Sequence, residues 1–207
     1  MSRIVSPGQL IVLSAPSGGG KTTIAHALLK QDRNIVRSIS CTTRLPRPGE
    51  KNQKDYWFLK PNQFLTMQRH GAFLEYAKVH SHWYGTPRPW VHRQIQRGKD
   101  VLMVIDVQGG LAIKKIEPQS LLIFLKPPTF SILKQRLIDR CSDSPRAIQQ
   151  RLHDARKELR QARFYDVVIV NDDLSQAIRE VLDTIHQFRN AAAHSKPSLT
   201  VGKLNFQ

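Results

Sequence analysis

The chain has 207 residues, of which 40% are hydrophobic, and it carries a formal net charge of +16. This length suits one globular domain with a sizeable core, and the longest apolar runs are too short to span a bilayer. We expect no secretory signal, and the two cysteines, Cys41 and Cys141, lack the spacing of a metal site or a disulfide framework. A cytoplasmic protein is therefore predicted. The positive charge fits either a polyanion such as RNA or a pocket for several phosphates.

The first elements in chain order are a strand, a glycine-rich loop and a helix. Residues 9–14 read QLIVLS, which is typical of a short buried strand. They run directly into the loop at 15–20, and residues 21–30 place apolar side chains on one side of an expected helix. Strand, loop and helix in this order form the setting in which a phosphate-binding loop occurs.

Residues 38–90 follow a different pattern, in which short strands alternate with turn residues. Strands are predicted at 56–58 and 73–79. A helix is expected to begin at Pro61, because proline is well tolerated in a first helical turn. We interpret this stretch as a lobe inserted into the core.

Three continuous apolar strands follow, at residues 101–105, 121–125 and 167–170. Such strands, alternating with helices, predict an α/β fold in which helices cover both faces of a parallel sheet. A last helix is predicted after the N-cap residue Asp173, and its helical spacing stops at Asn190.

These patterns divide the chain into a core, two insertions and a tail. We find no internal repeat and no low-complexity segment. The expected boundaries are 1–37, 91–130 and 164–190 for the core, 38–90 for the inserted lobe, 131–163 for a helical segment and 191–207 for a loose C-terminal tail.

The glycine-rich loop carries most of the phosphate-binding pattern Gly-x-x-x-x-Gly-Lys-Ser/Thr, with Ala15 in place of the first glycine. Its glycines let successive N–H groups point at phosphate oxygens, and the helix N-terminus adds positive partial charge. Lys21 is expected to contact the β- and γ-phosphates, and the Thr22 hydroxyl to bind Mg²⁺. The predicted triphosphate-binding residues are Ala15, Pro16, Ser17, Gly18, Gly19, Gly20, Lys21 and Thr22.

Asp106 directly follows the predicted strand at 101–105. A carboxylate at this position can hold Mg²⁺, directly or through water. An ordinary strand-end or N-cap aspartate is the alternative. Because the phosphate loop is present, we favour the metal interpretation.

Five runs of residues stand in order along the chain: SCTTRLPRPGE at 40–50, FLE at 73–75, WYGT at 83–86, IDVQG at 105–109 and IVNDD at 169–173. Together they resemble the signature of the guanylate kinase family. The matches follow the family order from about residue 9 to residue 188, and together they are more specific than the phosphate loop alone. The resemblance implies a P-loop nucleoside monophosphate kinase fold with an inserted GMP-binding lobe and a helical lid. It also implies transfer of the γ-phosphoryl group of ATP to GMP, with Mg²⁺ as cofactor.

The resemblance assigns the acceptor site to the inserted lobe. Two arginines and two tyrosines would bind the phosphate, because guanidinium groups form forked hydrogen bonds with a dianion. Glu75 would accept both donors of the guanine edge, N1–H and the 2-amino group, which adenine does not present. Taken singly, each residue could also be an ordinary loop or half-buried side chain. The predicted GMP-binding residues are Ser40, Arg44, Arg47, Tyr56, Glu75, Tyr84 and Thr86.

The resemblance also assigns arginines to a lid over the phosphates. Arg136, Arg140 and Arg151 match these arginines, and with Lys21 they are the predicted catalytic residues. Since an acceptor phosphate oxygen is already anionic at neutral pH, no general base is expected. Catalysis should come from alignment and charge neutralisation.

Residues 141–145 form a turn-rich stretch between two predicted helices, the second of which should begin near Pro145 with Ser144 as N-cap. This arrangement suits a flap that closes and excludes water. Asn171 matches a family position near the adenine. Three further arginines of the segment, Arg156, Arg160 and Arg163, are interpreted as solvated.

The chain departs from the family pattern at Val104, at Gln53 and at two local variants beside binding residues, Cys41 and Trp83. Val104 stands where many members have an aspartate that contacts the bound GMP, and Gln53 replaces a glycine often seen before the tyrosine matched by Tyr56. The first departure predicts weaker GMP binding than in typical members.

Three other functions compete with this interpretation. The intact Gly-Lys-Thr run argues against a peptide-binding guanylate-kinase-like module, and the lack of an aromatic stacking motif argues against an RNA-binding protein. Glu75 and Ser40 argue against a kinase for another monophosphate. We expect ATP and GMP as substrates, with dGMP as a further candidate, and neither a membrane nor a nucleic acid as partner. The oligomeric state stays open.

Overall fold

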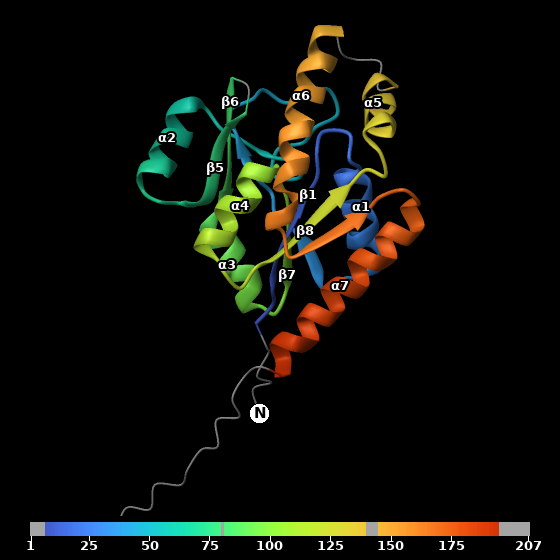
Figure 1. Ribbon diagram of the computed structural model, residues 1–207. Coiled ribbons are helices and arrows are strands. Elements are labelled where there is room, and N and C mark those ends of the chain that lie inside the picture. The colour runs from blue at the N-terminus through green and yellow to red at the C-terminus, as the bar shows by residue number, and fades with distance from the viewer. Residues whose placement is uncertain (1–6, 80, 140–144, 195–207) are drawn as a thin grey trace, which may run out of the picture.

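A computed structural model describes residues 7–79, 81–139 and 145–194 (Figure 1). Its central sheet is parallel throughout and has the strand order β2-β7-β1-β8-β9. The α/β fold with a parallel sheet is confirmed. The strands are β1 (Leu10–Ser14), β2 (Ile35–Arg37), β7 (Asp100–Val104), β8 (Leu121–Lys126) and β9 (Val167–Val170).

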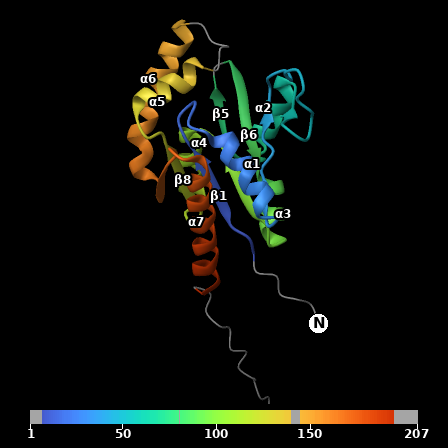
Figure 2. The same ribbon diagram turned by 90° about the vertical axis from the view of Figure 1, so that its right-hand side faces the viewer.

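Helices lie on both faces of this sheet, as Figures 1 and 2 show. One face packs against α1 (Lys21–Gln31) and α7 (Leu174–His194), which lie in front of the sheet in Figure 2. The other face packs against α3 (Arg88–Gln96) and α4 (Val107–Ile116). The two buried clusters formed in this way hold the strand ends, and therefore the loops that follow them, in fixed positions.

The edge strand β9 is less covered than its apolar sequence suggests. Val168 and Val170 are 43% and 49% exposed, whereas Ile169 is buried against the α7 side. The expectation of a strand buried on both faces is therefore wrong for β9, because a strand at the sheet edge receives cover mainly on one face.

The inserted segment forms a second sheet with the order β4-β3-β6-β5. Phe64 and Phe73 stack with ring centroids 4.5 Å apart and form its small core with Cys41. The helix that begins at Pro61 is confirmed. The elements are β3 (Cys41–Thr42), β4 (Trp57–Phe58), α2 (Pro61–Arg69), β5 (Phe73–Val79) and β6 (His82–Pro87).

Two helices follow β8 and share a separate buried cluster of Leu133, Leu137 and Ala155. They are α5 (Phe130–Ile138) and α6 (Pro145–Gln161), and a short 3₁₀ helix η1 (Ala162–Phe164) continues α6. Arg140, the turn at 141–144 and the predicted Ser144 cap lie outside the described residues.

The last helix begins as predicted, because the Asp173 carboxylate accepts the Gln176 backbone N–H at 2.6 Å. It continues past Asn190 to His194. No helix in the described part of the chain is long and apolar enough to cross a membrane.

Candidate active site

The glycine-rich loop connects the buried end of β1 to the N-terminus of α1. Gly18 and Gly20 have φ angles of 85° and 93°, in the left-handed region that a side chain disfavours. No side chain caps the first turn of α1. The backbone N–H groups of that turn are therefore left for an anion, which the helix dipole also attracts.

Ala15 fits the loop although it replaces the first glycine of the pattern. It is buried, and its carbonyl accepts a hydrogen bond from Lys21 Nζ. A Cβ added at Gly19 would lie 2.7 Å from the Ala15 Cβ, so the methyl group is accommodated only because residue 19 is glycine. Lys21 thus folds back across the loop.

Asn171, at the end of β9, fastens the loop from the other side. Its Nδ2 donates to the Gly19 carbonyl at 3.0 Å, and its own carbonyl accepts from Arg136 at 3.2 Å. A Cβ at Gly20 would lie 2.3 Å from the same Nδ2. The structure therefore brings Asn171 and Arg136 to the phosphate loop, and Arg151 lies half-buried on α6.

One acidic residue beside the loop has no counterpart in the sequence prediction. Glu158 of α6 is half-buried, and this burial raises the pKa of its carboxyl, while Lys21 and a hydrogen bond from the Ser17 backbone oppose the rise. α6 therefore reaches the loop with a carboxylate. A single glutamate in a basic helix gave no sequence signal for this contact.

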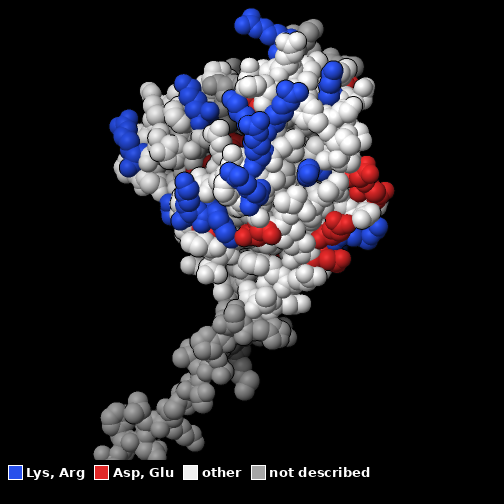
Figure 3. Space-filling model, viewed as in Figure 1, with Lys and Arg blue, Asp and Glu red and all other residues white. Residues whose placement is uncertain are grey.

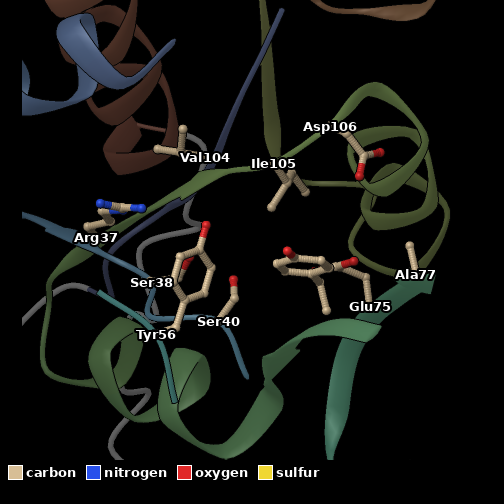
Figure 4. Close-up of a pocket in the computed structure, with 10 residues that line it drawn as sticks. Arg37, Ser38, Ser40, Tyr56, Glu75, Ala77, Val104, Ile105 and Asp106 are labelled. Atoms are coloured by element: carbon tan, nitrogen blue, oxygen red, sulfur yellow. The ribbon is translucent and has the colours of Figure 1, made fainter. Parts of the chain in front are cut away.

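A pocket lies between the carboxyl ends of β2 and β7 and the strands of the lobe (Figure 4). Five predicted residues line it: Ser40, Tyr56, Glu75, Tyr84 and Asp106. Parallel α/β sheets bind ligands at this edge. The lining residues that the sequence prediction did not include are Arg37, Ser38, Ala77, Val104 and Ile105.

Glu75 is the buried acid of this pocket, with 9% of its surface exposed. Antiparallel pairing of β5 with β6 places Thr86 opposite Glu75, and the Thr86 hydroxyl donates to Oε1 at 2.8 Å. The hydroxyls of Ser40 and Thr86 lie 3.5 Å apart. Burial, with a smaller contribution from Asp106, raises the pKa of Glu75 to about 7. The alternative of an exposed strand residue is wrong.

Arg44 is held beside the pocket by Glu50. Two guanidinium nitrogens donate to the Glu50 oxygens, both at 2.9 Å, and Nε donates to the Tyr84 hydroxyl at 3.3 Å. The guanidinium also lies 5.4 Å from the Tyr56 ring centroid. Arg47 is exposed, and its backbone N–H donates to Glu50 at 2.7 Å. Sequence reasoning missed Glu50, although it belongs to the matched run at 40–50.

Asp106 connects the pocket to the phosphate loop. Its Oδ1 accepts the Gly109 backbone N–H at 2.9 Å as the N-cap of α4, and its carbonyl accepts from the Ser14 hydroxyl at 3.3 Å. Thr22 lies exposed in the first turn of α1. In the described part of the chain no three acidic, histidine or cysteine side chains gather as metal ligands.

The turn before Tyr56 keeps a glycine-like backbone without a glycine. Gln53 has a φ angle of 67°, and it is the one described non-glycine residue with positive φ. Its N–H donates to the Tyr56 carbonyl at 2.8 Å. The departure predicted at this position therefore leaves the turn in place but puts strain into it.

Most of the positive charge in view in Figure 3 gathers over α6 and the neighbouring helices, away from the acidic end near α7. Arg156, Arg160 and Arg163 are exposed, as expected. Arg156 and Arg163 stack on the rings of Phe130 and Phe164 at 4.8 and 4.7 Å. These contacts are surface stacking, which keeps the guanidinium groups in water.

Residues 7–188 match the model of a family described as guanylate kinase. The chain belongs to the guanylate kinase family. A guanylate kinase of Wolbachia pipientis wMel is 42% identical over 95% of this chain and 98% of its own length. One from Thermus thermophilus is 47% identical over 84% of this chain and 79% of its own length.

A crystal structure of guanylate kinase from Anaplasma phagocytophilum is similar to the described fold. It has a TM-score of 0.73 and 34% identity, and the match covers 88% of this chain and 86% of that one. The range 7–188 matched by the family model includes the phosphate loop, the lobe and α5 and α6, so membership of the family applies to nearly the whole chain.

Proposed function

We propose that the protein transfers the γ-phosphoryl group of ATP to GMP, giving ADP and GDP. Membership of the guanylate kinase family supports this activity. The observation that carries the choice of acceptor is the buried carboxylate of Glu75, which lines a pocket beside the phosphate loop.

The pocket selects guanine through its hydrogen-bonding edge. Glu75 accepts from N1–H and the 2-amino group, while Thr86 holds the carboxylate in place at 2.8 Å. Ser40 is the donor to guanine O6. Adenine would leave a buried carboxylate without donors, and a site of this kind discriminates strongly against it.

The phosphate of GMP is bound by Arg44, Arg47, Tyr56 and Tyr84. Glu50 orients the guanidinium of Arg44 before GMP arrives, which reduces the side-chain entropy lost on binding. Tyr84 lines the pocket and accepts a hydrogen bond from Arg44, so it connects Arg44 to the pocket. The segment 38–90 is thus proposed to be the GMP-binding lobe.

The loop from Ala15 to Thr22 binds the phosphates of ATP, and Asn171 lies near the adenine. Lys21, Arg136, Arg140 and Arg151 neutralise the charge on the transferring group. The segment 131–163 is proposed to act as the lid, since its helix α6 reaches the loop through Glu158.

Mg²⁺ is the proposed cofactor. The donor set fits this ion, because Mg²⁺ is held by one or two protein oxygens together with substrate phosphates rather than by a full protein cage. Thr22 and Asp106 supply such oxygens, directly or through water, and one Asp106 oxygen is already oriented by Gly109. When bound, the ion would neutralise charge on the phosphates.

An oxygen of the GMP phosphate attacks the γ-phosphorus in line, and no residue has to remove a proton. Ser14 links the loop to Asp106 and so ties the donor side to the acceptor pocket. The rate enhancement then comes from alignment and from positive charge around the transferring group.

We propose that the protein acts in the cytoplasm on free nucleotides, with dGMP as a further candidate acceptor. The two cysteines of the sequence agree with a reducing compartment. Cys41 is a free thiol buried in the lobe.

A coupled assay of ADP production tests this function with GMP, AMP, UMP, CMP and no acceptor. GMP should stimulate ADP production far above the other acceptors. If GMP gives no more ADP than the reaction without acceptor, the proposal is wrong. Stimulation by all four monophosphates would retain kinase activity but contradict the role of Glu75.

A further inference from the structure

One arginine of the acceptor pocket has no role in the site described above. Arg37 is the last residue of β2, and it lines the pocket together with Tyr56 and Val104. Figure 4 shows Arg37 and Val104 at one end of the pocket, with Glu75 at the other. The cation therefore lies at the end away from the guanine-binding acid.

The fold holds Arg37 at this position through its backbone. β2 pairs with β7, Arg37 stands opposite Leu102, and the next N–H, that of Ser38, donates to the Leu102 carbonyl at 2.9 Å. Val104 is two residues further along β7, beside the end of β2. The charge is thus carried on a rigid sheet edge rather than on a loop.

Arg37 is half-buried, and its guanidinium forms no hydrogen bond or ion pair with another residue in the parts of the chain that the structure describes. Arg44, whose guanidinium also contacts the Tyr56 ring, is in contrast neutralised by the two oxygens of Glu50. A partly buried cation without a partner is unfavourable, and an anionic ligand removes this cost.

Val104 belongs to the same arrangement. An aspartate at this position, as many members of the family have, would put a carboxylate next to Arg37 and neutralise it. Valine leaves the guanidinium uncompensated. Compared with a pocket that has aspartate at position 104, this pocket lacks one carboxylate and has one uncompensated guanidinium at the end opposite Glu75.

The Tyr56 hydroxyl identifies the ligand group that this end receives. Arg37 is the strongest of the charges that lower the pKa of Tyr56, against the larger effect of burial, which raises it. The charge of Arg37 is thus close enough to affect the Tyr56 hydroxyl, which is assigned to the acceptor phosphate. The chemistry of this end is that of a phosphate dianion.

We propose that Arg37 is a third arginine for the acceptor, binding the 5′-phosphate of GMP together with Tyr56. The inference rests on the proposed function and adds a binding residue to it. It also removes the expectation of weaker GMP binding that Val104 alone suggested, because the valine keeps Arg37 available.

Kinetics of Arg37→Gln test the proposal, with Arg33→Gln as the matched control on an exposed arginine outside the pocket. The KM for GMP should rise about tenfold or more in Arg37→Gln, while the KM for ATP changes less than about twofold. Arg37→Lys keeps the charge but loses the paired hydrogen bonds of a guanidinium, so it should give an intermediate KM for GMP. Arg33→Gln should leave both constants unchanged.

Binding of GMP and of guanosine, which lacks the phosphate, separates a phosphate contact from a structural role. Arg37→Gln should weaken GMP about tenfold and leave guanosine, measured by competition, unchanged. Equal losses for both ligands, or a wild-type KM for GMP in a folded Arg37→Gln or Arg37→Lys variant, would overturn the proposal. A lower kcat with unchanged KM for GMP would place Arg37 on the transferring group and also overturn it.

The same measurements distinguish this inference from the proposed function. If the wild-type protein phosphorylates GMP and the Arg37 variants do so with unchanged KM, only the role of Arg37 is wrong. If the wild-type protein shows no GMP-dependent turnover, the function is wrong and the inference falls with it.

Discussion

The two ends of the active site are built by different means. At the donor end the backbone provides most of the arrangement: glycines with positive φ, an uncapped helix N-terminus, and the Gly19 carbonyl that Asn171 fastens. At the acceptor end side chains provide it, through Glu75 with Thr86 and Arg44 with Glu50. A backbone site recognises any polyphosphate, whereas a side-chain site recognises one base.

The largest effect should come from the lysine of the donor end. Lys21→Ala should lower kcat about 100- to 1,000-fold, the usual cost of removing one preorganised charge from the transition state. The KM for GMP should change little, because Lys21 is on the loop and not in the pocket. Lys30→Ala, an exposed change in the last turn of the same helix, is the control. Near-normal phosphoryl transfer by Lys21→Ala would refute the assignment.

At the acceptor end, Glu75→Gln should raise the KM for GMP about 10- to 100-fold, because the amide nitrogen meets a donor where the carboxylate met an acceptor. The KM for ATP should stay the same. Steady-state kinetics with each substrate varied in turn measure both constants. Asp172→Asn, an exposed control, should change neither. Equal changes in both KM values would mean that the two ends are not separate.

The acceptor end should depend on pH near neutrality. Because burial raises the pKa of Glu75 to about 7, the free protein holds a proton there below pH 7, and GMP must displace it. GMP affinity, measured by titration calorimetry without Mg²⁺, should be level above pH 8 and fall about tenfold between pH 8 and pH 6.

The matched control for this profile is Glu75→Gln, which lacks the titrating group but keeps the titration of the GMP phosphate. Its profile should be flatter. Folding stability changes with pH in the opposite direction from GMP affinity. Because the carboxyl pKa is raised, the folded state loses stability as pH rises from about 4.5 to 7. Glu75→Gln should therefore melt higher than the wild-type protein at pH 8, and this advantage should vanish near pH 4. An unchanged difference across this range would contradict the raised pKa.

The sequence predicted the donor end better than the acceptor end, because the donor end is built from a local backbone pattern. The loop is a local pattern, and the strands β1, β7 and β8 are continuous apolar runs that only a buried sheet uses. The strands β2, β3 and β6 were missed, since their mixed residues have no clear period.

Contacts between distant residues gave no local signal. Asn171 and Gly19 are 152 residues apart, and only the position of β9 in the sheet brings them together. Glu75 was assigned through the family resemblance, and its strand pattern alone suggested an exposed side chain. Arg37 was not found at all, because a charge at a strand end looks the same whether it faces solvent or a pocket.

A smaller effect should follow from loosening the donor loop. Asn171→Ala removes the donor to the buried Gly19 carbonyl and should lower the free energy of unfolding by about 1–2 kcal/mol. The KM for ATP should rise while the KM for GMP stays the same, since Asn171 is absent from the pocket lining. Denaturant unfolding and kinetics measure these effects, with Asp172→Ala as the exposed neighbour. A raised KM for GMP instead would show that the loop and the pocket respond together.

The smallest effect is expected at Gln53 in the lobe, whose backbone has a positive φ angle like Gly18 and Gly20 of the donor loop. Gln53 holds a φ of 67° in the turn that positions Tyr56, a conformation that costs a side chain about 1 kcal/mol or more. Gln53→Gly relieves this strain but adds unfolded-state entropy, so the net gain in stability should be about 0.5 kcal/mol. Gln53→Ala keeps the strain and should gain nothing. Thermal unfolding of both variants gives the difference, and a Gly variant no more stable than the Ala variant would mean that the turn relaxes in solution.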